Sequence, residues 1–89
     1  MPIWKLTPLD LRDPNWEASS HQAFAIVRAR SEAVARATAA RAFDVKTGFR
    51  PGKGQIISPW MRPALVKTEA VDDERYDDKG PAAVLQPAF

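Results

Sequence analysis

The chain has 89 residues and a formal net charge of +2, with 45% hydrophobic and 27% charged residues. That length provides one small core, and the composition is typical of a globular domain rather than of a disordered chain. There is no cysteine, which excludes disulfides, thiolate metal sites and a cysteine nucleophile. No stretch is apolar for long enough to span a membrane, and the first residues lack a signal-peptide pattern. We therefore expect a soluble, cytoplasmic protein without a membrane partner.

Charge is segregated along the chain. Residues 28–67 carry nine lysines and arginines against two acidic residues, whereas residues 68–89 carry six acidic residues against two basic ones. A basic middle and an acidic end indicate either charge pairing within the fold or a polarised binding surface.

The first half of the chain predicts two strands. One covers residues 3–7 and stops before Pro8, because proline cannot donate to a strand ladder. The second covers residues 23–29, the most apolar run of the chain, and leads directly into a helix.

That helix is predicted over residues 31–43. Ser31 is a suitable N-cap, Glu32 complements the positive end of the helix dipole, and six alanines favour the helical state. Helical spacing predicts a narrow buried face, with Arg36 and Arg41 pointing away from it. The residues of this predicted face are Val34, Ala35, Thr38, Ala39, Ala42 and Phe43.

The second half predicts a loop, a strand and a tail. Residues 46–63 contain three glycines and three prolines, which indicates a long loop. Residues 64–71 alternate as a half-buried strand, and residues 72–89 form an acidic, proline-containing tail that is irregular and partly docked. The prediction is thus a single α+β domain over residues 1–71, in two layers. One helix packs on one face of a three-stranded sheet, with the chain order β-β-α-β and the last strand parallel to the second.

Catalytic and metal-binding patterns are weak. His21, the only histidine, follows Ser19 and Ser20 without a nucleophile-elbow motif, and the glycines at 48–54 lack Walker A spacing. The acidic run at 72–80 lacks the alternating ligands of a calcium loop. We therefore expect a protein that is not an enzyme and that has no cofactor and no metal.

The long loop at 46–63 predicts an interaction site for a protein partner or a second copy of the chain. Phe49, Arg50, Trp60 and Arg62 place aromatic and cationic groups in a loop that a scaffold can position. A core position is the alternative for Trp60, as for the other two tryptophans, because a small domain needs large side chains to fill its core.

A nucleic-acid-binding module is the alternative function. In the basic segment 28–67, cationic and aromatic side chains interleave, as they do on single-strand binding surfaces, although no RNP, KH or helix-turn-helix signature is present. The residues that would contact phosphates are Arg28, Arg30, Arg36, Arg41, Lys46, Arg50 and Lys53.

Short motifs rich in Trp, Pro and Asp accompany these elements: Trp4-Lys5-Leu6-Thr7-Pro8, Asp13-Pro14-Asn15-Trp16, Val27-Arg28-Ala29, the Ala/Arg helix, Ser58-Pro59-Trp60 and Arg75-Tyr76. Over nearly its whole length this layout resembles a group of small bacterial proteins of unknown function. The resemblance implies a bacterial, freestanding domain, and it implies no activity and no functional residue.

Overall fold

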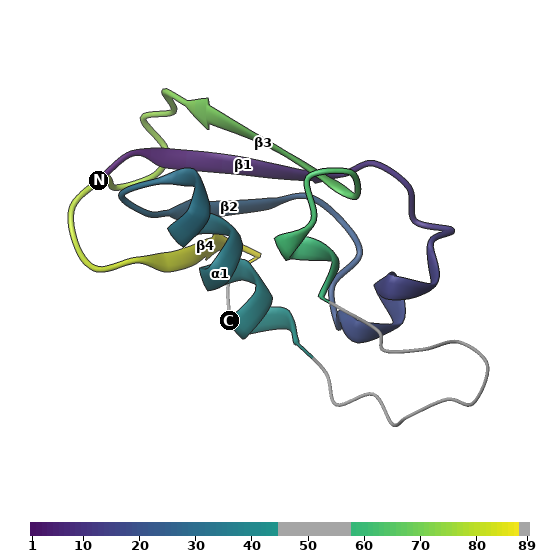
Figure 1. Ribbon diagram of the computed structural model, residues 1–89. Coiled ribbons are helices and arrows are strands. Elements are labelled where there is room, and N and C mark those ends of the chain that lie inside the picture. The colour runs from purple at the N-terminus through teal and green to yellow at the C-terminus, as the bar shows by residue number, and fades with distance from the viewer. Residues whose placement is uncertain (45–57, 88–89) are drawn as a thin grey trace.

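The computed structural model describes residues 1–44 and 58–87, in which one α-helix packs on a four-stranded antiparallel sheet (Figure 1). The elements in chain order are β1 (Ile3–Pro8), the 3-10 helix η1 (Pro14–Ala18), β2 (Ala25–Arg28), α1 (Glu32–Phe43), the 3-10 helix η2 (Pro59–Met61), β3 (Val66–Val71) and β4 (Ala83–Gln86). This agrees with the α+β class that the sequence predicts. No helix within the two described ranges is long and apolar enough to cross a membrane.

The sheet has the strand order β3-β1-β2-β4. β1 is antiparallel to both of its neighbours, and Ile3 lies opposite Arg28 on one side and Val71 on the other. β2 and β3 therefore run in the same direction, as predicted for the strands that the helix connects. They are not adjacent, because β1 lies between them and forms a split β-α-β unit.

The prediction of three strands and an irregular tail is wrong at β4. This strand pairs antiparallel with β2, with Val27 opposite Val84, and the ladder shifts register next to Ile26. The strand has only four residues and lies between Pro81 and Pro87. Its sequence does not alternate between apolar and polar residues, so it has no local strand signal. β4 is a strand because its backbone pairs with that of the apolar strand β2, which its local sequence does not predict.

Helix α1 begins where it was predicted, because the Ser31 hydroxyl accepts a hydrogen bond from the Val34 amide at 3.3 Å. Its buried face differs from the prediction. Arg36, predicted to point outward, is only 7% exposed, and Ala42, predicted to be buried, is exposed. The buried helix residues are Ala35, Arg36, Ala39 and Phe43.

Three aromatic rings fill the core where α1 meets η1 and η2. The Trp16 and Trp60 rings meet edge to face at 5.4 Å, and the Phe43 ring lies 5.1 Å from Trp60. None of the three is more than 1% exposed. The Trp60 indole nitrogen also donates to the Ser19 hydroxyl at 2.9 Å, which satisfies a buried donor. This cluster anchors both short helices to α1.

Candidate functional site

Of the four residues predicted for the interaction loop, the structure describes Trp60 and Arg62. Trp60 has no exposed surface and belongs to the core, the alternative that the sequence left open for it. Arg62 is exposed, and its neighbour Met61 is 47% exposed. Phe49 and Arg50 lie outside the described residues. Trp60 is thus an anchor for η2 rather than a contact for a partner.

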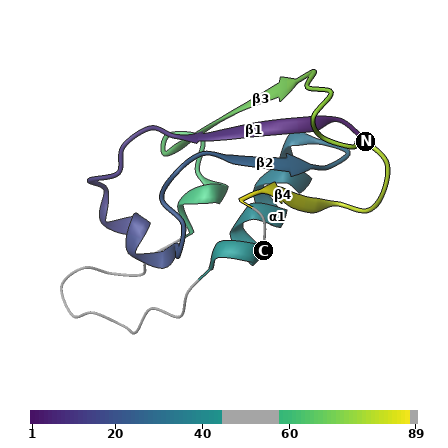
Figure 2. The same cartoon turned by 180° about the vertical axis from the view of Figure 1, so that it is seen from behind.

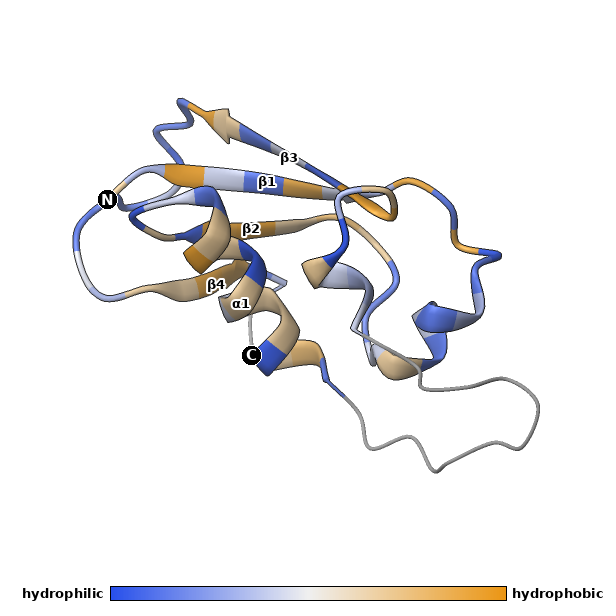
Figure 3. Cartoon of the chain, viewed as in Figure 1, coloured by the Kyte–Doolittle hydropathy of each residue, from blue (hydrophilic) through white to orange (hydrophobic). Residues whose placement is uncertain are grey.

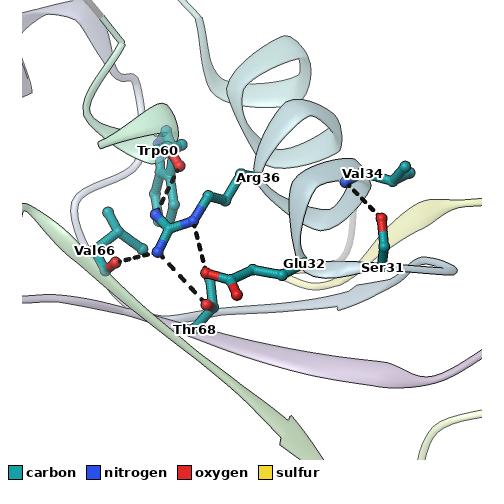
Figure 4. A network of polar contacts seen from close by, with 7 residues as sticks. All are labelled: Ser31, Glu32, Val34, Arg36, Trp60, Val66 and Thr68. Atoms are coloured by element: carbon teal, nitrogen blue, oxygen red, sulfur yellow. Dashed lines mark hydrogen bonds and ion pairs between the residues drawn. The ribbon is translucent and has the colours of Figure 1, made fainter. Parts of the chain in front are cut away.

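Arg36 is a structural residue rather than a phosphate contact (Figure 4). Its guanidinium donates to the carbonyl oxygens of Trp60 at 3.2 Å and Val66 at 2.8 Å, and to the Glu32 carboxylate at 3.2 Å. The Thr68 hydroxyl first and Arg36 second lower the pKa of Glu32, because both hydrogen-bond its charged form. Arg36 therefore ties α1 to η2 and to the edge strand β3. These carbonyl contacts explain why the helix buries a charged residue.

Arg28 is likewise used within the fold. It donates to the carbonyl oxygens of Pro81 and Asp77, both at 2.8 Å, and so holds the connection between β3 and β4. Gly80 in this connection has φ +117°, and a Cβ there would lie 3.0 Å from the Arg28 guanidinium. Arg28 therefore fixes the path of the chain into β4.

Four of the predicted polyanion contacts lie within the described residues, and they differ in how far they are engaged in the fold. Two of them, Arg28 and Arg36, bind backbone carbonyls, whereas Arg30 and Arg41 are exposed. Lys46 and Lys53, with Arg50, lie outside the described residues.

A groove runs along the outer side of α1, next to β4, with a volume of about 680 Å³. We call it the α1–β4 groove. It is lined by Ala33, Val34, Ala37, Thr38, Arg41, Ala42, Ala82, Ala83 and Val84. In Figure 3 much of the α1 ribbon has the colours of weakly hydrophobic residues, with hydrophilic residues between them. Alanines on both sides of the helix were visible in the sequence, but the position of β4 beside them was not.

His21 and Ser19 are not paired as a base and a nucleophile. The His21 ring lies 4.7 Å from Phe43, and its Nε2 is 3.0 Å from the Phe24 carbonyl oxygen. The Ser19 hydroxyl donates to the backbone carbonyl of His21 and accepts from Trp60, so it is not directed at the imidazole. Within residues 1–44 and 58–87, no three His, Asp or Glu side chains gather as metal ligands.

Comparison with protein-family models, with curated proteins and with solved structures found no match to this chain.

Proposed function

We propose that this protein is a non-enzymatic binding module whose α1–β4 groove receives an apolar helix of a partner protein. One observation carries the proposal: on the side next to β4, α1 presents the small apolar residues Ala33, Ala37 and Ala42 to an open groove. A contiguous apolar patch that is left exposed marks a site of protein interaction. The outer side of α1 therefore has the composition of a surface that a second element covers.

The shape of the groove favours a helix as the occupant. Ala33 and Ala42 are exposed near the two ends of α1, and Ala37 lies between them along the groove. Small side chains along one helix allow a second helix to approach closely, and Val84 on β4 adds an apolar wall. The 12 residues of α1 match about three turns of a partner helix.

Charge supports a partner with an acidic residue. Arg41 is the one charged residue that lines the groove, and among the described residues it has no ion pair. A carboxylate on an otherwise apolar partner helix would complement it, and the pair would set the direction in which the helix lies.

The two surfaces that the sequence predicts receive less support. Of the contacts predicted in the loop at 46–63, Arg62 is exposed and Trp60 is buried in the core. A nucleic-acid surface would need cations that are free to reach phosphates, and Arg28 and Arg36 are engaged within the fold.

The test is an NMR titration of the 15N-labelled protein with a synthetic amphipathic peptide of about four helical turns. The peptide is apolar on one side and carries one glutamate placed to face Arg41; a second peptide carries lysine there. We expect amide shifts on α1 and β4, and weaker binding of the lysine peptide.

Two variants control for the fold. Ala37→Glu places a charge in the groove and should abolish the shifts, whereas Ala64→Glu, the same change at an exposed turn residue, should leave them unchanged. Shifts outside the groove, or equal binding by both variants, would refute the proposal. A molecular mass that doubles with protein concentration, with shifts on α1, would make a second copy the occupant instead of another protein.

A further inference from the structure

The second face of the sheet, opposite α1, carries a pocket that is independent of the α1–β4 groove. Figure 2 shows this face, and no helix of the described chain lies over it. The pocket has a volume of about 420 Å³, and its floor includes Ile26 and Val71. Ile26 is only 5% exposed although it lies outside the main core, so the residues around the pocket cover it. We call this cavity the second-face pocket.

Two aromatic rings border the second-face pocket, and each is accompanied by a cation. The Lys5 ammonium lies 5.4 Å from the centre of the Phe24 ring, and the Arg75 guanidinium carbon lies 5.6 Å from the centre of the Tyr76 ring. Phe24 is 45% exposed, so part of its ring is accessible to a ligand. These four residues come from β1, from the segment before β2 and from the connection between β3 and β4, so the fold brings them together.

The residues that line the pocket include one carboxylate and two cations, so their charges sum to +1. Glu69, which lies opposite Lys5 on β3, does not line the pocket. Asp73 accepts three hydrogen bonds from the Arg75 side chain, at 2.7, 3.1 and 3.2 Å. These bonds lower the pKa of Asp73 to about 2, so the group is ionised at neutral pH. Lys5 and Arg75 together exceed this charge by one. Arg75 itself is 80% exposed, so its other donors remain accessible.

We propose that the second-face pocket binds a small planar aromatic anion, a ring with one carboxylate or phosphate group. The ring would lie against Phe24 and Tyr76 over the apolar floor, and its anionic group would meet Lys5 and Arg75. Gln86, which also lines the pocket, offers an amide that can donate to the anion or to a ring substituent.

A small ligand fits the pocket better than a nucleic-acid strand. The volume lies near the lower end of the range for small-molecule sites. The exposed acids Asp72 and Glu74 lie in the same connection as Arg75, and they would repel the phosphates of a longer chain. A single ring with one anionic group meets the attractive groups without extending past these acids.

The test is an NMR titration with four probes: benzoate, phenyl phosphate, benzyl alcohol and acetate. We expect benzoate, phenyl phosphate or both to shift the amides around the pocket, and their relative affinities identify the anionic group. Benzyl alcohol lacks the charge and acetate lacks the ring, so each should bind about tenfold more weakly or not at all.

Variants separate the pocket from the fold. Phe24→Ala and Arg75→Gln should each weaken benzoate binding about tenfold. Met61→Ala and Arg62→Gln remove an exposed apolar side chain and an exposed cation elsewhere, and should have no effect. Asp73→Asn removes the competing carboxylate and should tighten binding, a change that loss of structure cannot produce.

Three results would overturn the proposal. Acetate or benzyl alcohol could bind as tightly as benzoate, which would remove the requirement for a charged ring. The shifts could lie away from the second-face pocket. A thymidine decanucleotide could bind more tightly than phenyl phosphate and with a steep salt dependence, which would make the face a nucleic-acid surface.

Discussion

Each face of the sheet has an arginine next to an aromatic residue, but one pair is buried and the other is accessible to solvent. On the face that carries α1, Trp60 is fully buried and its carbonyl oxygen accepts a hydrogen bond from Arg36. On the second face, Tyr76 is half-buried and Arg75 lies over its ring, 80% exposed. An aromatic residue next to an arginine is therefore not by itself a sign of function. Burial and the partners of the guanidinium decide whether the pair holds the fold together or remains accessible to a ligand.

The partners of the two arginines make this difference concrete. Arg36 donates to two backbone carbonyls that have no access to water, so its removal leaves buried acceptors unsatisfied. Arg75 donates to the carboxylate of Asp73, which can turn to water if the arginine is lost. The first arrangement stabilises the fold, and the second costs little to rearrange around a ligand.

The largest expected difference between the two faces is the loss of folding stability when an aromatic residue is replaced by alanine. Trp60→Ala should lower the free energy of unfolding by about 3–5 kcal/mol, because it empties the centre of the Trp16–Phe43 cluster. Phe24→Ala should change it by less than about 0.5 kcal/mol, because Phe24 is already exposed. Urea unfolding followed by circular dichroism measures both.

Equal losses of stability in these two variants would contradict the comparison. They would mean that Phe24 is a core residue for the second face, and that the pocket beside it is only a gap in packing. Trp60→Phe refines the result: it keeps a ring but removes the indole donor to Ser19, so it should cost less than the alanine variant.

Replacing Arg36 should also cost more folding stability than replacing Arg75, by a smaller amount than for the aromatic residues. Arg36→Met should cost about 2–4 kcal/mol, because the carbonyls of Trp60 and Val66 both lose their donor. Arg75→Met should leave the urea midpoint close to that of the wild type. Arg36→Lys keeps the charge beside Glu32, but a single ammonium cannot reproduce the planar fork that reaches both carbonyls. Full rescue by lysine would show that the ion pair, not the carbonyl contacts, is what Arg36 contributes.

Local signals in the sequence were sufficient for the helix and for three strands. The Ser31 cap and the alanines define α1, and the apolar runs around Ile3, Val27 and Val66 mark β1, β2 and β3. Each of these features depends on residues that are close in the chain, so propensity and periodicity are enough to find it.

What the sequence did not predict depends on contacts between distant segments. Helical spacing alone predicts that Arg36 faces solvent. Its partners Trp60 and Val66 lie 24 and 30 residues further along the chain, so local sequence cannot predict its burial. β4 exists through its pairing with β2. The second-face pocket combines Lys5 with Tyr76, which lie near opposite ends of the chain, and the only local hint was the Arg75-Tyr76 pair.

The smallest expected effect is the pH dependence of the Asp73–Arg75 pair. Hydrogen bonds from Arg75 lower the pKa of Asp73 from an ordinary 3.8 to about 2. A lowered pKa in the folded state means that the carboxylate stabilises the fold above the ordinary value, and that this contribution is lost as the pH falls to about 2. Asp73→Asn removes the contribution at every pH. The urea midpoints of wild type and variant should therefore differ slightly near neutral pH and converge in strong acid.

The cause of that convergence can be separated from a general loss of stability in acid. Arg75→Gln removes the donor that lowers the pKa of Asp73. The urea midpoints of Arg75→Gln and the wild type should therefore converge over the same acidic range as those of Asp73→Asn and the wild type. The double variant should add nothing beyond either single one, because the two changes remove one interaction. Additive effects would mean that the carboxylate and the guanidinium act through different neighbours. Arg75 would then be held over Tyr76 by the ring alone, and Asp73 would not compete with an anion for it.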